Sequence, residues 1–178
     1  MASDLRRVQR ALDAEENGIG ELLGQEWIKD YCSPATKARY ETLTAAIINE
    51  FHDRIVKLPW MSETTKQKAL SKLAHVRRKV AYPDKWRDYS TLTIGRESYA
   101  ANQVAVERWR FRFMADRLGK PVDRDYWDMT PQTYNAYYDP SLNEIVLPAA
   151  AFALPGLPDS LVDDALLYAY AGGSTIGH

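Results

Sequence analysis

The chain has 178 residues, of which 46% are apolar and 26% are charged, and its formal net charge is −1. These values exclude a largely disordered chain and a strongly basic surface for nucleic acid, and they fit a single domain over residues 1–178. No apolar stretch reaches the ~20 residues of a membrane-spanning helix. The N-terminus has no signal-peptide core, so we expect a soluble chain without a targeting signal.

The N-terminal part of the chain is predicted to be helical. A first helix is expected over residues 4–23, with Ser3 as its cap and Gly24 as its end. A second helix begins at Pro34, and Pro59 ends it. The second helix has the clearest periodicity in the chain, because apolar residues recur at steps of three or four. They are Tyr40, Leu43, Ile47, Phe51, Ile55 and Leu58.

Two further helices follow in the prediction. Ser62 caps the third helix, whose expected buried face consists of Ala69, Leu70, Leu73 and Val76. The basic run over residues 72–79 is interpreted as a solvated helix end. After a turn over residues 82–86, a longer helix is expected over residues 96–118. Its inward residues are expected to be Tyr99, Val106, Trp109 and Phe113.

The pattern changes after Trp127. Residues 133–138 and 144–147 favour strands, and the turn-forming residues between them indicate a hairpin. Prolines then interrupt regular structure, and the chain becomes helical again from Ser160 to His178. The sequence therefore predicts a mainly α fold with a small antiparallel β-sheet (α+β). It has a helical part over 1–126, a sheet over 127–150 and a last helix over 160–178.

Few side chains indicate chemistry by their pattern alone. His52 and His75 have no second metal ligand at helical spacing, and nothing follows His178. Cys32 is the only cysteine, so it forms no internal disulfide, and without a partner it is expected to be inert. The last 14 residues are almost uncharged, which is unusual for a natural terminus and indicates an interrupted chain. Composition and periodicity alone support a helical domain with a small sheet.

Four stretches carry a resemblance to a known family. They are residues 58–62, 80–89, 127–138 and 143–149, and they include the sequences Trp60-Met61, Tyr82-Pro83-Asp84-Lys85-Trp86 and Asn135-Ala136-Tyr137-Tyr138. In order and spacing they resemble the neprilysin and endothelin-converting enzyme family of zinc metallopeptidases. The resemblance covers nearly the whole chain, and it implies a partial thermolysin-like metallopeptidase domain.

The resemblance implies a substrate-binding role for Asn135 and Ala136. In the family, the corresponding residues lie on an edge strand beside the active-site cleft and hold the main chain of the peptide. An edge strand offers unpaired N–H and C=O groups to which an extended peptide can add. The alternative is that Asn135 only caps a turn.

The resemblance also implies that His178 is the first zinc ligand. The family continues from this histidine as Glu-x-x-His, in which two histidines bind Zn²⁺ and the glutamate is the general base. A later glutamate completes the site. Because these groups are missing, we expect the complete enzyme to use Zn²⁺ and this chain alone to bind it weakly and to be inactive.

The resemblance leaves three functions open. The chain is a fragment of a peptide-cleaving endopeptidase, a non-catalytic peptide-binding module, or a structural helical domain. Its expected partners are a peptide substrate and the remainder of the peptidase domain, with no nucleic acid and no membrane segment. The family implies a parent protein outside the cytoplasm.

One segment departs from the family pattern. Ala153 and Gly156 lie where the family has a more aromatic segment that helps to shape a substrate pocket. This difference puts in doubt the family's usual preference for substrates with large apolar side chains.

Overall fold

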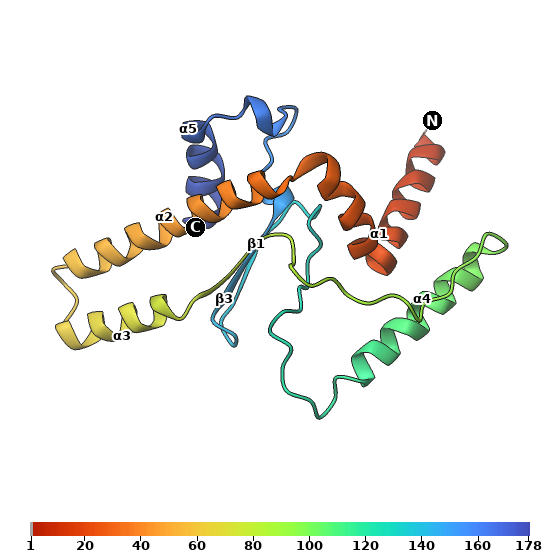
Figure 1. The fold of residues 1–178 in the computed structure, drawn as a ribbon, viewed down its shortest axis with the longest axis horizontal. Coiled ribbons are helices and arrows are strands. Elements are labelled where there is room, and N and C mark those ends of the chain that lie inside the picture. The colour runs from red at the N-terminus through yellow and green to blue at the C-terminus, as the bar shows by residue number, and fades with distance from the viewer. Residues whose placement is uncertain (1) are drawn as a thin grey trace. The chain divides into compact units, whose positions relative to one another are not determined.

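The computed structural model describes residues 2–178, with side chains from Leu5 onward. Helices make up most of the described chain, together with one small sheet (Figure 1). The chain divides into two compact units. The first combines the residues up to Glu26 with Asp84–Tyr126, and the second combines Trp27–Pro83 with Trp127–His178. The predicted mainly helical fold with a small sheet is confirmed.

Helix α1 spans Ala2–Tyr31 and is kinked at Ile19, whose φ of −128° and ψ of 24° are not helical. The prediction that Gly24 ends this helix is wrong. The helix continues because Trp27 and Ile28 pack against the hydrophobic core of the second unit. Burial of two large side chains outweighs the cost of one helical glycine, about 1 kcal/mol. The capping role expected of Ser3 concerns a side chain outside those that the structure describes.

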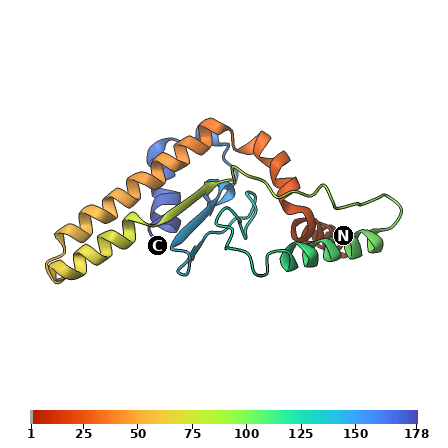
Figure 2. The ribbon, with the colours of Figure 1, turned by 60° about the horizontal axis from the view of Figure 1, so that its bottom comes forward.

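Helices α2 (Pro34–Lys57) and α3 (Glu63–Ala74) lie side by side (Figures 1 and 2). Each begins as predicted, because Ser33 Oγ accepts a hydrogen bond from Thr36 N (3.1 Å) and Ser62 Oγ accepts one from Thr65 N (3.3 Å). The apolar stripe of α2 is buried only in its first half, at Tyr40 and Leu43. No described residue of α3 is fully buried, so its predicted buried face is only partly covered.

The sheet has three strands in the order β1-β3-β2, formed by β1 (Arg77–Ala81), β2 (Tyr137–Asp139) and β3 (Glu144–Pro148). The predicted hairpin is present as the antiparallel pair β2–β3. Strand β1 pairs with β3 in parallel, so the sheet is mixed. The interpretation of residues 72–79 as a solvated helix end is wrong from Arg77 onward, because Lys79 is buried in β1.

The first unit contains helix α4 (Tyr99–Ala115), which Ser98 caps through a hydrogen bond from Ala101 N (3.2 Å). Val106 and Trp109 are buried as predicted, but Tyr99 is exposed. Trp109 stacks on Tyr89 with ring centroids 4.5 Å apart. These aromatic contacts hold α4 against the segment that precedes it.

The C-terminal segment contains two short 3₁₀ helices, η1 (Ala149–Phe152) and η2 (Asp159–Leu161), followed by α5 (Asp164–Leu167). From Tyr168 to Ile176 (η3) the backbone is wound as a π-helix. Helix α2 contacts both β1 and this π-helical segment (Figure 2). The core of the second unit therefore lies between α2, the sheet and the C-terminal segment, where Tyr40 stacks on Phe152 at 4.2 Å.

Candidate functional site

The segment Asn135–Ala136 lies directly before β2, which is an edge strand of the sheet. Asn135 is exposed, and its backbone N–H donates to the Thr133 carbonyl (2.9 Å). Its side-chain Oδ1 accepts a hydrogen bond from Ala136 N (2.8 Å). The amide Nδ2 has no partner in the described part of the chain. The side chain therefore has one group in a local turn and one donor free for a ligand.

The turn between β2 and β3 is fixed by side chains. Asp139 Oδ1 accepts hydrogen bonds from Ser141 N (2.8 Å), Ser141 Oγ (2.6 Å) and Leu142 N (3.3 Å). The two bonds from Ser141 lower the pKa of Asp139, so the carboxylate stays ionised. Asn143, in the left-handed region at φ 50°, accepts from Tyr138 OH (2.7 Å) and donates to the Lys72 carbonyl (3.0 Å). These bonds set the position of the edge strand.

A buried ion pair joins the two parallel strands of the sheet. Lys79 Nζ lies 2.6 Å from Glu144 Oε1, and the two side chains are only 5% and 2% exposed. Glu144 Oε2 is buried and has no hydrogen-bond partner among the described residues. The pair links β1 to the central strand β3, and Glu144 lies opposite Asp139 of β2 in the strand register. It therefore supports the strand that the candidate site uses.

A tyrosine contact connects the candidate peptide-binding segment with the C-terminal helix. The hydroxyl of Tyr134, next to Asn135, hydrogen-bonds to the hydroxyl of Tyr170 in the π-helical segment, and this bond raises the pKa of Tyr170. Tyr170 belongs to the same segment that leads to His178. The contact therefore joins the residue before Asn135 to the π-helical segment, about two turns before His178.

Arg39 of α2 holds the start of the C-terminal helix. Its Nε donates to Asp164 Oδ1 (2.8 Å), and its Nη2 donates to the Val162 carbonyl (2.6 Å). Its Nη1 lies 3.6 Å from Asp159 Oδ1, which also accepts from Tyr40 OH (2.9 Å). Burial and Asp159 raise the pKa of Tyr40, so its hydroxyl stays protonated and donates. Sequence analysis missed this cluster because its members are about 120 residues apart.

His178 is exposed and follows Gly177, whose N–H donates to the Gly172 carbonyl (2.8 Å). Of the other histidines, His52 lies 3.1 Å from Asp53 Oδ1 and His75 lies 2.7 Å from the Ser71 carbonyl. A catalytic zinc site normally has three protein ligands. Among residues 2–178, no group of three or more His, Cys, Asp or Glu side chains could hold a metal ion. The role of His178 as a zinc ligand therefore stays a prediction.

An open cavity of about 670 Å³ lies beside the Arg39 cluster. Its apolar wall includes Trp27, Tyr31, Tyr40 and Phe152, and its polar wall includes Asp159. Cys32 is buried in the core next to it, and burial raises the pKa of this thiol to about 12. The thiol is therefore protonated at neutral pH, in agreement with its expected inertness.

No helix in the described part of the chain is long and apolar enough to cross a membrane.

Comparisons with known proteins identify relatives over nearly the whole chain. A family model described as "Peptidase family M13" matches residues 2–83. Neutral endopeptidase of Lactobacillus helveticus is 31% identical over 175 residues, which are 97% of this chain and 27% of that protein. Human endothelin-converting enzyme 1 is 31% identical over 147 residues, which are 79% of this chain and 19% of that protein.

Solved structures give the same result. The cryo-EM structure of the Mycobacterium tuberculosis zinc metalloprotease Zmp1 in its open state is 41% identical, with a TM-score of 0.79, over 92% of this chain and 25% of that one. The PepO crystal structure from Lactobacillus rhamnosis is 27% identical, with a TM-score of 0.77, over 92% of this chain and 26% of that one. The chain thus spans about a quarter or less of the length of these relatives.

Proposed function

Because the chain belongs to the neprilysin and endothelin-converting enzyme family, peptidase family M13, we propose that it is part of a zinc-dependent metalloendopeptidase that hydrolyses peptide bonds in oligopeptides. In this proposal residues 1–178 form the N-terminal part of a peptidase catalytic region. The observation that carries it is the contact between the segment before edge strand β2 and the helical segment that leads to His178.

The edge strand is proposed to bind the substrate main chain. Strand β2 pairs with β3 on one side only within the described sheet, so an extended peptide can add to its other side. Asn135 Nδ2 is a free donor at the start of this strand and suits a peptide carbonyl. Ala136 offers backbone groups there, although its N–H donates to Asn135 Oδ1 without a ligand. Substrate binding would exchange this local bond for one to the peptide.

His178 is proposed as one zinc ligand of the complete enzyme. Zinc bound by three protein ligands would activate a water molecule and polarise the peptide carbonyl. A single exposed imidazole supplies one of these ligands, so the 178-residue chain is expected to bind Zn²⁺ weakly and to cleave no peptide. Metal analysis and a fluorogenic peptide assay on the purified chain check this expectation. Tight, stoichiometric zinc would contradict it.

The second candidate function is a peptide-binding module without hydrolysis. It is favoured by the same edge strand and by the free Asn135 amide, neither of which requires a metal. The third candidate, a purely structural domain, predicts that peptide binding is absent or insensitive to Asn135→Ala. By family resemblance the partners are a peptide substrate and the remainder of the peptidase domain, and the parent protein acts outside the cytoplasm.

The source gene beyond the codon for His178 separates these functions. The peptidase proposal predicts that it continues as Glu-x-x-His and later supplies a glutamate ligand. A gene that lacks the first glutamate would remove the general base and would leave the peptide-binding module as the better proposal. Binding of a labelled peptide to the wild-type chain and to Asn135→Ala then tests the module itself, with Asn17→Ala as a control at an exposed asparagine on α1.

A further inference from the structure

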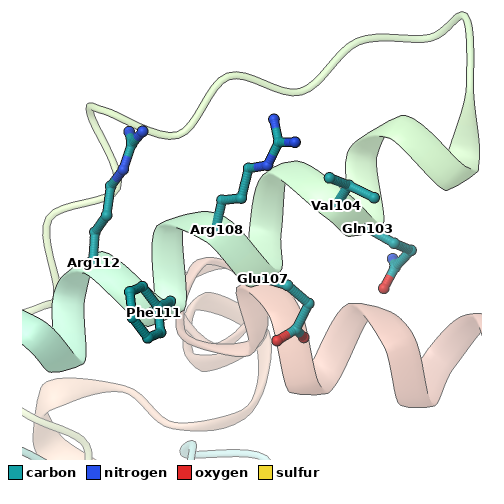
Figure 3. Close-up of a pocket in the computed structure, with 6 residues that line it drawn as sticks. All are labelled: Gln103, Val104, Glu107, Arg108, Phe111 and Arg112. Carbon is teal, nitrogen blue, oxygen red and sulfur yellow. The ribbon is translucent and has the colours of Figure 1, made fainter.

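The two candidate site regions, Asn135–Ala136 and the segment that leads to His178, both belong to the second unit. The first unit has hollows of its own, and one of about 530 Å³ lies beside Val104, Arg108 and Phe111 (Figure 3). All residues that line this hollow belong to helix α4. The groups that can hold the two site regions against each other therefore lie within the second unit.

The π-helical segment is packed tightly on its inner side. Its residues Ala171, Gly172 and Ile176 are buried, and a Cβ on Gly172 would lie only 3.1 Å from Ile47 Cδ1 of α2. Gly177 N donates to the Gly172 carbonyl (2.8 Å), five residues back, which closes a π-type turn. Such turns are rare and occur frequently at functional sites. The segment therefore has one well-defined position against α2.

Tyr170 lies on this segment directly before the buried Ala171 and Gly172. Ser174 Oγ donates to the Tyr170 carbonyl, so the next turn of the segment is tied to its main chain. The Tyr170 hydroxyl contacts that of Tyr134, which lies 36 residues earlier in the chain. The side chain of Tyr170 therefore connects a fixed part of the backbone to the turn that contains Asn135.

Tyr134 belongs to a compact turn before strand β2. Thr133 N donates to the Thr130 carbonyl (3.0 Å), the hydroxyls of these two threonines lie 2.8 Å apart, and Asn135 N donates to the Thr133 carbonyl (2.9 Å). These bonds shape the turn, and the Tyr134 side chain joins it to the π-helical segment.

The contact between the two tyrosines is poorly suited to stabilising the fold. Tyr134 is 63% exposed. A hydrogen bond between accessible hydroxyls adds little to the free energy of unfolding, because each hydroxyl can bond to water instead. The contact is better suited to setting the position of one segment relative to another.

We infer that Tyr134 and Tyr170 are positioning residues, whose hydroxyl contact holds the Asn135 turn at a fixed place relative to the helical segment that leads to His178. The inference rests on the proposed function, in which Asn135 binds the peptide main chain and His178 is one metal ligand. A bound peptide reacts only when its carbonyl group is correctly placed, and a displacement of about 1 Å can cost roughly 100-fold in rate. The tyrosine pair limits that displacement without touching the substrate.

Removal of either hydroxyl tests the inference in the longer polypeptide that the source gene encodes. Tyr134→Phe, Tyr170→Phe and the double variant keep the aromatic rings and should unfold at the wild-type temperature. Each single variant should lower kcat about tenfold and change KM less than about twofold, because the peptide still binds at Asn135 but is less well aligned. The double variant should be no worse than either single variant, since all three lose the same contact.

Tyr168→Phe is the matched control. Tyr168 lies in the same π-helical segment and is 41% exposed. Its hydroxyl has no hydrogen-bond partner in the described part of the chain. Its removal should leave kcat, KM and the unfolding temperature unchanged.

Two measurements on the zinc-free polypeptide are independent of catalysis. The affinity for a labelled peptide should stay within about twofold of wild type in Tyr134→Phe and Tyr170→Phe, because the binding groups are retained. Amide hydrogen exchange at Asn135 and Ala136 should become several-fold faster in both variants, because the turn is released from the π-helical segment. Tyr168→Phe should change neither quantity.

Four outcomes would overturn the inference. A wild-type polypeptide that cleaves peptides, with kcat and exchange rates unchanged in the Tyr134→Phe and Tyr170→Phe variants, would overturn this inference alone. Weaker peptide binding and a higher KM at unchanged kcat would show that the tyrosines contact the substrate. Effects that add in the double variant would show that the two hydroxyls act separately. A wild-type polypeptide without zinc-dependent cleavage would remove the proposed function and this inference with it.

Discussion

Glu144 and Lys79 show how a single residue can be misjudged from its neighbours in sequence. Lys79 follows Arg77 and Arg78, so the local pattern indicates a solvated basic run, yet its side chain is 5% exposed. Its partner Glu144 is 65 positions away along the chain. Neither residue gives a signal in sequence that they meet. The pair could only be found once the parallel register of β1 and β3 was known.

Removal of one charge of this pair should destabilise the folded chain more than replacement of both residues by apolar ones. Glu144→Gln removes the negative charge that Lys79 faces in this buried pair and should reduce the free energy of unfolding by about 3–5 kcal/mol. The double variant Lys79→Met with Glu144→Leu removes both charges and should lose much less. Urea unfolding of the wild type, the single variant and the double variant checks this. Equal losses in both variants would show that shape, and not charge pairing, stabilises the site.

Two buried side chains that lose a proton at alkaline pH, Cys32 and Tyr40, should make the stability of the second unit fall at high pH. Burial raises the pKa of Cys32 from 9.0 to about 12, and burial with Asp159 raises that of Tyr40. Their protonated forms are favoured in the folded state, so stability is full below pH 9 and falls as the pH rises toward 12. Urea unfolding at pH 8 and pH 10.5 measures this loss, and Cys32→Ala should reduce it. A flat profile would contradict the assigned burial.

At the scale of elements, the helix starts and the hairpin were predictable and the remaining boundaries were less so. Ser33, Ser62 and Ser98 all cap helices, because capping is a local interaction between a side chain and the next turn. The end of α1 was misplaced because packing of Trp27 against distant residues decides it. Strand β1 was missed for the same reason, since its partner β3 follows more than 60 residues later.

The π-helical segment gives the sharpest prediction at this scale. A Cβ on Gly172 would lie 3.1 Å from Ile47 Cδ1 and 3.6 Å from Leu43 Cδ1 of α2, whereas one on Gly173 would contact nothing within 4 Å. Gly172→Ala should therefore destabilise the chain by about 1–3 kcal/mol through overpacking. Gly173→Ala, the matched control, should be neutral or stabilise by up to about 1 kcal/mol. Denaturant unfolding compares them, and equal effects would contradict this packing.

At the scale of the whole molecule, family membership was recognisable from four short stretches because their residue order is specific. One of these stretches names Asn135 and Ala136 as site residues, and the resemblance of the chain's last residues to the family's zinc motif names His178; these roles stay predictions. The contact between Tyr134 and Tyr170 and the Arg39 cluster had no signal in the sequence. They depend on residues brought together by the fold, and the chain spans only about a quarter of its relatives.

The most direct test of the central claim is a kinetic comparison in the longer polypeptide that the source gene encodes. The account predicts peptide cleavage that a chelator abolishes and zinc restores. It also predicts that Asn135→Ala lowers kcat/KM about tenfold, the value of one hydrogen bond of roughly 1.4 kcal/mol, while Asn17→Ala has no effect. Cleavage that needs no metal, or an Asn135→Ala variant with unchanged kcat/KM, would contradict the edge strand β2 as the substrate-binding element of a zinc endopeptidase.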